Sequence, residues 1–260
     1  MAIKIGLDAG HSEESRGTYS VESVIDNLFE DYYTLDLCLM LANRLTSNGF
    51  EVFLTRKDEE AVGDVSDRAE ACVAAGCDFA VSIHFNGFGN ETANGTEVYV
   101  PYGEKAANIE VGFYNCLTKF FKERKPFARS SGTKNHAKIL DKKMNLATKK
   151  FDAVSKETDY FGFVRTAWQN GLSADLLEVC FLTNRKDFDT YWRNREDIAD
   201  GLAKAIVEGF GKEYDPNKGV VELPKPQKPV EEKPVQPEKP QKPKSVGKGR
   251  LNKNRVDVKY

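Results

Sequence analysis

The sequence predicts an α/β fold: a single domain with a mostly parallel central sheet of about six strands flanked by helices, followed by a Pro/Lys-rich disordered linker. Two observations support this prediction. Short apolar, strand-like runs alternate with segments whose apolar residues recur at helical spacing. The composition then changes near residue 215, because eight of the ten prolines lie between Pro216 and Pro243. The folded domain is therefore expected over residues 1–214, the linker over residues 215–244 and a basic segment over residues 245–260.

The first expected elements are a strand and a long helix. Residues 3–7 form an apolar run that ends close to Gly10 and His11. After a polar loop, a helix is expected over residues 28–47, where Asn48-Gly49 ends it with a left-handed cap. Its apolar face comprises Leu35, Cys38, Leu39, Ala42 and Leu45.

The later elements repeat this alternation, which is typical of βαβ units. A helix capped by Asp64 or Ser66 is expected to reach residue 75. The other expected elements are strands over residues 51–55, 79–84, 96–100, 163–167 and 175–180, and helices over residues 104–123 and 197–210.

The charge is unevenly distributed, although the whole chain has a net charge of only −2. Residues 216–260 hold 12 lysines and arginines against 5 acidic residues, whereas residues 1–215 hold 26 against 35. The acidic domain argues against nucleic acid as the main ligand, because neutralising phosphates requires basic clusters. The basic tail instead favours contact with a polyanionic surface.

Targeting signals are not visible in the sequence. No run reaches the roughly 18 apolar residues of a membrane-spanning helix, so no membrane insertion is expected. The N-terminus reads as the first strand directly after Met1, with no signal peptide. The five scattered cysteines are expected to be reduced thiols of a protein made in the cytosol.

Two histidines come at the ends of apolar strands. His11 follows the first strand, and His84 ends the run Val81-Ser82-Ile83. Because ligands bind at the carboxyl ends of strands in open α/β sheets, both imidazoles are expected at one edge. A catalytic zinc site needs three protein ligands and one open position. The candidates for the third ligand are His136, Glu22, Asp26 and Glu30, although Glu30 or Asp31 could instead compensate the helix dipole.

Glu178 interrupts an otherwise buried strand between Leu177 and Val179. Glutamate is rarely buried without a partner, so this carboxylate is a candidate general base. The alternative is a structural salt bridge to Arg165 or Arg185.

The ordered set of motifs resembles the zinc-dependent N-acetylmuramoyl-L-alanine amidase family of type 3, over about residues 3–211. The motifs are Gly10-His11, Glu30 at a helix start, the run Gly49-Phe50-Glu51-Val52-Phe53-Leu54-Thr55-Arg56, Asp67-Arg68, Ser82-Ile83-His84-Phe85-Asn86, Gly95-Thr96-Glu97-Val98 and the run from Leu176-Leu177-Glu178 to Asn184.

The resemblance implies a zinc amidase catalytic domain in residues 1–214. By position, His11, Glu30 and His84 would bind Zn²⁺, Glu178 would be the catalytic carboxylate, and His136 has no counterpart. The implied reaction is hydrolysis of the amide between N-acetylmuramic acid and L-alanine in peptidoglycan. Zinc would polarise the carbonyl and activate water, while Glu178 would take the water proton and return it to the leaving amine.

Two segments depart from the family pattern. Ser12-Glu13-Glu14 replaces a glycine-rich stretch, and the segment over residues 129–159 is longer than usual. This longer segment is expected to be a solvated insertion, with a wall-contacting flap as the alternative. Asn86 is expected to orient a neighbouring loop or the substrate.

A leaderless amidase with a linker resembles a bacteriophage endolysin, which is made in the host cytoplasm and acts at the bacterial cell wall after release. Residues 245–260 are then either the start of a cell-wall-binding module or a contact with anionic cell-wall polymers. The alternatives are a host autolysin, another zinc-dependent wall peptidase or deacetylase, and a non-catalytic cell-wall-binding protein.

Overall fold

The computed structural model describes residues 2–21, 29–58, 63–101, 108–124, 142–145, 150–153, 159 and 161–218. The chain divides into two units, Met1–Pro229 and Val230–Tyr260, and all of the described residues belong to the first. Apart from residues 215–218, the expected linker over 215–244 and the basic segment over 245–260 lie outside the described residues.

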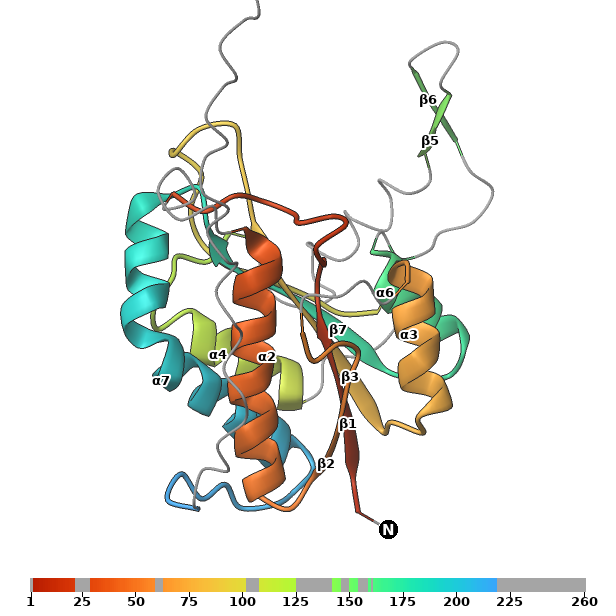
Figure 1. The fold of residues 1–260 in the computed structure, drawn as a ribbon, viewed down its shortest axis with the longest axis vertical. Coiled ribbons are helices and arrows are strands. Elements are labelled where there is room, and N and C mark those ends of the chain that lie inside the picture. The colour runs from red at the N-terminus through yellow and green to blue at the C-terminus, as the bar shows by residue number, and fades with distance from the viewer. Residues whose placement is uncertain are drawn as a thin grey trace, which may run out of the picture. The chain divides into compact units, whose positions relative to one another are not determined.

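Within the described residues, five strands form the central sheet in the order β2-β1-β3-β7-β4 (Figure 1). The strands are β1 (Lys4–Ala9), β2 (Glu51–Leu54), β3 (Phe79–Asn86), β4 (Glu97–Tyr99) and β7 (Ala174–Phe181). β1 pairs in parallel with β2 and β3, and β3 pairs in parallel with β7. β4 pairs antiparallel with β7, so β4 begins at the edge where the parallel strands end.

Helices cover both faces of this sheet (Figure 1). α2 (Glu30–Ser47), α4 (Asn108–Leu117) and α7 (Arg185–Gly209) lie on one face, and α3 (Val65–Ala74) and α6 (Gly162–Gln169) lie on the other. The larger core lies under the first group, where side chains such as Leu7, Val81 and Ile83 are fully buried. The smaller core under α3 and α6 includes Cys72 and Phe163.

The pleat explains why polar residues interrupt the buried strands. Successive side chains of a strand point to opposite faces, so the residues between the apolar positions of β3 face the α3–α6 side. His84 on β3 is register-paired with Glu178 on β7, and Glu178 is paired with Glu97 on β4. Register-paired side chains share a face. These three polar side chains therefore stand in one row near the edge where the parallel strands end.

The predicted α/β fold with a mostly parallel central sheet was confirmed, and within the described residues this sheet has five strands where about six were expected. Residues 163–167 were expected as a strand but lie in α6. Phe163, Val164 and Ala167 are buried there at i, i+1 and i+4, a helical spacing that a segment of five residues with three apolar positions does not distinguish from a strand.

The last helix is also longer than expected, because α7 begins at Arg185 instead of residue 197. Its first turns are rich in charge, and their apolar contacts come mainly from Phe188 and Tyr191. Asn184 caps this start by accepting a hydrogen bond from the Asp187 amide. The helix expected over residues 104–123 is α4, which ends at Leu117.

Other local predictions were confirmed. Asp64 caps α3 through a capping box with Asp67, and Gly49 follows α2 with a φ of +87°. The five cysteines are all described, and all are free thiols. In the segment over residues 129–159, the structure describes a separate antiparallel pair, β5 (Lys142–Asn145) and β6 (Lys150–Ala153).

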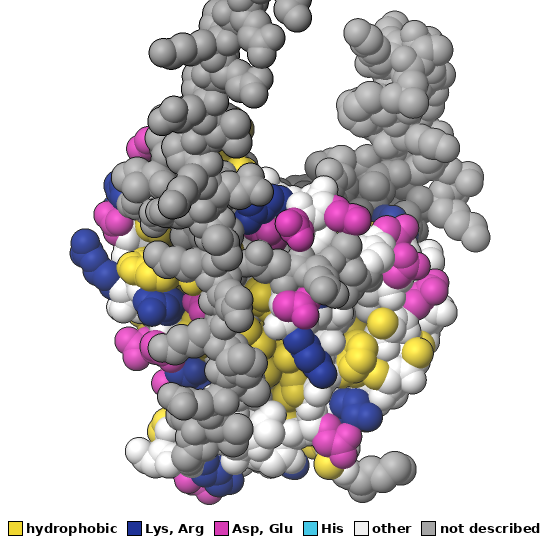
Figure 2. All heavy atoms as spheres, viewed as in Figure 1, with side chains coloured by type: hydrophobic (Ala, Val, Ile, Leu, Met, Phe, Trp, Pro, Cys, Tyr) yellow, Lys and Arg dark blue, Asp and Glu magenta, His cyan; other side chains and the backbone are white. Residues whose placement is uncertain are grey.

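The surface in Figure 2 carries both signs of charge. Lysine and arginine side chains alternate there with aspartate and glutamate, and hydrophobic side chains are visible between them (Figure 2). Among the described residues, none of the helices has the length and apolar character required to cross a membrane.

Candidate metal centre

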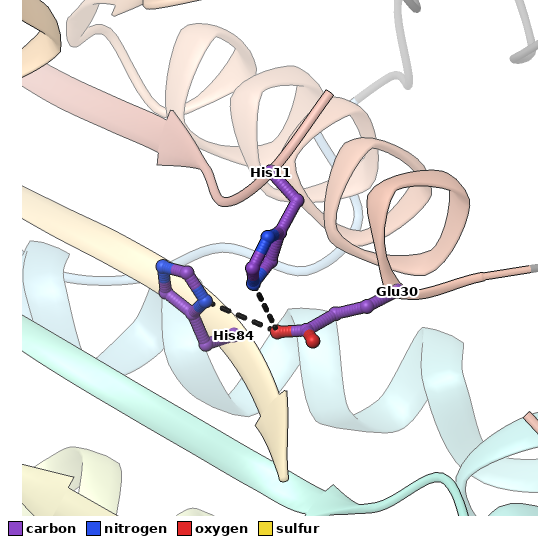
Figure 3. Close-up of side chains that lie close together, drawn as sticks. All are labelled: His11, Glu30 and His84. Atoms are coloured by element: carbon purple, nitrogen blue, oxygen red, sulfur yellow. Dashed lines mark hydrogen bonds and ion pairs between the residues drawn. The ribbon is translucent and has the colours of Figure 1, made fainter. Parts of the chain in front are cut away.

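Three side chains from distant parts of the sequence converge at the edge where β1 and β3 end (Figure 3). His11 lies two residues after β1, His84 lies near the end of β3, and Glu30 is the first residue of α2. Their ligand atoms all lie within 4.8 Å of one another. Nε2 of His11 is 3.3 Å from Oε1 of Glu30, and Nδ1 of His84 is 3.0 Å from the same oxygen.

The backbone holds His11 in an unusual position. Its φ is +64°, which is uncommon for a residue other than glycine. Nδ1 of the ring lies 2.9 Å from the carbonyl oxygen of Ser15. A proton on Nδ1 satisfies this carbonyl and leaves Nε2 as the nitrogen that could bind a metal ion, which is the usual outer-shell arrangement of a metal-binding histidine.

Glu30 is buried and surrounded by donors. Oε1 accepts a hydrogen bond from the Phe85 amide, and Oε2 accepts one from the Thr18 amide, each at 2.9 Å. Burial acts to raise the pKa of Glu30, but the hydrogen bonds to His11 and His84 outweigh it and the pKa falls well below its usual range. For His11, burial acts to lower the pKa, but Glu30 raises it overall. Glu30 is therefore an anion at neutral pH.

Two glycines make room for these rings. A Cβ on Gly10 would lie 2.3 Å from Cε1 of His84, and a Cβ on Gly17 would lie 2.6 Å from Oε2 of Glu30. Gly17 also has a φ of +73°, which favours glycine independently of the space. The chain therefore passes too close to the cluster at both positions for any side chain.

Arg56 joins the two segments that carry His11 and Glu30. Its buried guanidinium donates to the carbonyl oxygens of Ala9, Gly10 and Asp31, at 3.1, 3.2 and 2.6 Å. Ala9 and Gly10 precede His11, and Asp31 follows Glu30. One side chain thus fixes the end of β1 against the start of α2.

A buried ion pair between Asp8 on β1 and Arg68 on α3 lies close to the end of β1. Asp8 is fully buried and accepts hydrogen bonds from Arg68 and Thr55, each at 2.8 Å, and from Ser82 at 2.6 Å. Burial acts to raise the pKa of Asp8, but Arg68 and Ser82 lower it overall. Asp8 and Arg68 therefore form a buried ion pair that supports the strand ends.

Glu178 stands in the strand beside His84, the second histidine of the cluster. Its register partner on β3 is His84, and its Oε2 has no hydrogen-bond partner among the described residues and is shielded from solvent. Burial, together with the negative charges of Glu30 and Glu97, raises the pKa of Glu178 well above its usual value. Arg185 is 3.8 Å from Asp189, and Arg165 donates to the Asp159 carbonyl; no ion pair found among the described residues joins either arginine to Glu178.

Glu97 is held by three side chains on the other side of Glu178. It accepts hydrogen bonds from Asn86 at 3.1 Å and from Tyr99, and its Oε1 is 3.2 Å from Nε of Arg124. Asn86 thus orients the carboxylate of Glu97, and the role expected for it toward a loop or the substrate stays a prediction. Glu97 stands in the motif Gly95-Thr96-Glu97-Val98, but the sequence pattern assigned it no role, because its place beside Glu178 depends on the antiparallel pairing of β4 with β7.

The other candidate ligands are placed as follows. Glu22, Asp26 and His136 lie outside the described residues. Asp31 forms an ion pair with Arg16 at 3.0 Å. Among the residues that the structure describes, His11, Glu30 and His84 make up the one group of three or more such side chains that could hold a metal ion.

The donor set fits Zn²⁺. Ligands at about 2.0–2.2 Å from a tetrahedral ion lie about 3.3–3.6 Å apart, close to the separations of both histidines from Glu30. Two imidazoles and one carboxylate leave a fourth position open, and Glu178 is the register partner of His84 on the neighbouring strand. The three side chains could therefore hold a metal ion with one open position, near a carboxylate.

Comparisons with known proteins show the family of this chain. A family model described as N-acetylmuramoyl-L-alanine amidase matches residues 5–211. A search of curated proteins found no match.

Several solved structures share the fold. Cwp6 from Clostridium difficile is similar with a TM-score of 0.61 and 21% identity, over 80% of this chain and 29% of that chain. The catalytic domain of CwlV, an N-acetylmuramoyl-L-alanine amidase from Bacillus (Paenibacillus) polymyxa var. colistinus, has a TM-score of 0.58 and 21% identity, over 81% of this chain and 99% of that chain. The catalytic domain of the CD27L endolysin targeting Clostridia difficile has a TM-score of 0.53 and 18% identity, over 82% of this chain and 99% of that chain. Because the family model spans most of the sequence, this chain belongs to the type 3 N-acetylmuramoyl-L-alanine amidase family.

Proposed function

We propose that this amidase hydrolyses the bond between N-acetylmuramic acid and L-alanine with Zn²⁺ held by His11, Glu30 and His84, and with Glu178 as general base and acid. One observation carries the proposal: three zinc-type donors converge beside a carboxylate that has no partner of its own among the described residues. When bound, Zn²⁺ supplies a Lewis acid that polarises the scissile carbonyl and lowers the pKa of water toward about 7.

Glu178 moves the proton in this scheme. Its carboxylate accepts a proton from the attacking water as the oxygen bonds to the carbonyl carbon. It returns that proton to the amide nitrogen as the carbon–nitrogen bond breaks, so the products are a lactyl carboxylic acid and a free L-alanine amine. The raised pKa of Glu178 makes the carboxylate a stronger base than an exposed glutamate.

Analysis of the products tests the reaction. Purified cell wall is digested by the full chain, with and without a chelator and with Zn²⁺ restored afterwards. We expect new L-alanine N-termini without released acetate, lost in chelator and recovered with zinc. Released acetate would identify a deacetylase, other N-termini a peptidase, and intact wall together with no bound zinc a non-catalytic wall-binding protein.

A substitution separates the role of Glu178 from that of the metal ligands. Glu178→Gln should keep one bound zinc per chain and lose about 10²–10⁴-fold in turnover, the usual share of general acid–base catalysis. Turnover at the wild-type level on purified wall would contradict the assignment. Loss of the zinc would show that Glu178 acts as a ligand instead.

We also propose that the protein is a bacteriophage endolysin, made in the host cytoplasm and active at the cell wall after release. The Pro/Lys-rich sequence over residues 215–244 and the fold shared with the CD27L endolysin domain support this. Phage genes beside the coding sequence are expected, whereas a chromosomal locus of wall-growth enzymes would favour a host autolysin.

The basic segment over residues 245–260 is proposed to contact anionic cell-wall polymers. The full chain should then bind native walls more tightly than walls stripped of those polymers, and salt should weaken the difference. Equal binding to both walls would contradict this role.

A further inference from the structure

A cavity lies beyond β4, on the side of Glu97 away from β7. Its volume is about 400 Å³, and it is lined by Thr92, Ala93, Asn94, Lys122, Glu123 and Arg124. We propose that this cavity binds a carboxylate of the stem peptide that follows the cleaved amide, with Arg124 as the main recognition residue and Lys122 as the second. The inference rests on the proposed function and adds a specificity site to it.

The cavity belongs to the same edge of the sheet as the candidate metal centre. β4 runs antiparallel to β7, so the loop before β4 begins where the parallel strands end. Thr96 connects the two places: its hydroxyl donates to the Glu178 carbonyl at 3.1 Å, and its amide donates to the Lys122 carbonyl at 2.9 Å. A substrate that reaches past Glu178 along this edge therefore meets Lys122 and Arg124.

The charged side chains that line the cavity favour an anion, because two are cations, Lys122 and Arg124, and one is an acid, Glu123. Nε of Arg124 is bound to Glu97, but its two terminal amino groups have no hydrogen-bond partner among the described residues. Lys122 likewise forms no ion pair within that part of the chain. Glu123 is the one acid among the lining residues, and its carboxylate accepts a hydrogen bond from Tyr114 at 2.7 Å.

An adjoining cavity of about 250 Å³ shows the same imbalance. It shares Lys122 with the first cavity, and its acid is Asp187. Asp187 already accepts hydrogen bonds from the amides of Gly95 and Phe181, at 2.7 and 3.2 Å. In both cavities, the carboxylates have donors while cationic groups remain available.

Arg124 is oriented for a planar partner. Its guanidinium carbon lies 4.9 Å from the centre of the Phe181 ring, and Glu97 holds its Nε at 3.2 Å. The two terminal amino groups are then presented together, which matches the two oxygens of a carboxylate. Because Glu97 is itself held by Asn86 and Tyr99, the position of this fork is fixed before substrate binds.

The spacing of the strands sets which substrate residue reaches the cavity. Neighbouring strands lie about 4.8 Å apart, so β4 is about 10 Å from β3, and Arg124 lies beyond β4. An extended peptide advances about 3.3–3.6 Å per residue. The carboxylate is therefore expected on the second or third residue after the cleaved amide.

Three synthetic muramoyl tripeptides test the proposal with the full, zinc-loaded chain. One carries free carboxylates on the second and third residues, and each of the others has one of these replaced by a carboxamide. We expect kcat/KM to fall about 10- to 100-fold for one carboxamide substrate, the loss of a charge-assisted contact. Arg124→Gln should abolish this preference, Arg124→Lys should restore part of it, and Lys122→Gln should reduce it. Arg193→Gln, an exposed position on α7, should leave it unchanged.

The outcomes separate this site from the proposed function. Equal kcat/KM values for all three substrates in the wild type, or an undiminished preference in both Arg124→Gln and Lys122→Gln, would overturn the proposal while the amidase reaction stands. An equal loss on all three substrates in Arg124→Gln would also overturn it, because Arg124 would then act only by holding Glu97. If Arg124→Gln does not fold, the preference of Lys122→Gln decides. Failure of the wild type to cleave any of them would refute the proposed reaction and this site together.

Discussion

Gly10→Ala should remove zinc binding while leaving the domain folded. The added Cβ would lie 2.3 Å from Cε1, 2.5 Å from Nε2 and 2.7 Å from Nδ1 of His84, whereas ordinary contacts begin at 3.4 Å. The His84 ring must therefore move by about 1 Å. Metal–ligand distances tolerate deviations of about 0.2 Å, so a shift of this size takes the imidazole out of the site.

The expected magnitudes differ for binding and for stability. Loss of an outer-shell partner already costs about 10–100-fold in metal affinity, so displacement of a ligand should cost at least this much. The fold should change little. Forcing His84 off its rotamer costs about 0.5–1.5 kcal/mol, and replacing glycine by alanine at an ordinary backbone position returns about 0.4–1 kcal/mol.

The assay compares two glycine variants. Zinc affinity is measured by competition with a chromogenic chelator, and thermal unfolding is followed on the same samples. Gly89→Ala is the matched control, because a Cβ at that position would meet nothing within 4 Å. If Gly10→Ala binds zinc as tightly as Gly89→Ala, then His84 does not occupy the position that the metal site requires, and the reasoning fails.

Two further predictions concern the carboxylates around the site. Asp8→Asn leaves Arg68 buried without its partner and should cost about 3–5 kcal/mol of unfolding free energy at pH 6. The pKa of Asp8 is lowered in the folded state, so the difference in unfolding free energy between the wild type and Asp8→Asn should be present above the unfolded-state pKa of Asp8. It should close as the pH falls through the folded-state pKa. Urea unfolding of both proteins between pH 6 and 3 checks this. Burial is the main cause of the raised pKa of Glu178, and the negative charge of Glu97 adds to it. Glu97→Gln removes this charge and should lower the pKa of Glu178, so the acidic limb of the pH profile of kcat/KM should move to lower pH. A limb that stays in place or moves upward would contradict this.

The sequence predicted which residues come together better than it predicted how they are held. His11 and His84 end apolar runs, and strand ends of parallel sheets meet at one edge, so their convergence followed from local patterns. Glu30 could not be separated from Glu22 or Asp26 by pattern alone, since acids are common at helix starts for electrostatic reasons. The resemblance selected Glu30, and the structure places it against both histidines.

Local sequence patterns did not predict the roles of the residues that support the site, Arg56, Glu97 and Arg124. Arg56 contacts carbonyl groups on β1 and α2, and no side-chain pattern in a sequence marks which carbonyls a buried arginine will meet. Glu97 and Arg124 depend on β4 joining the sheet antiparallel beside β7, a choice set by tertiary packing. The misassigned strand over residues 163–167 has the same origin, because the three apolar residues of this short segment are compatible with either a helix or a strand until packing decides.

The two glutamates at this edge receive opposite environments, and that contrast is the physical basis for giving them different roles. Burial acts to raise the pKa of both. For Glu30, the two histidines reverse the effect and lower the pKa, which keeps a permanent anion available to a cation. For Glu178, Glu30 and Glu97 add to the effect, which favours binding a proton. Carboxyl groups whose environments separate their pKa values in this way are suited to holding a metal and to transferring a proton, respectively. Exchange of the two environments would disable both tasks, because a protonated Glu30 is a poor ligand and a Glu178 surrounded by donors is a weak base.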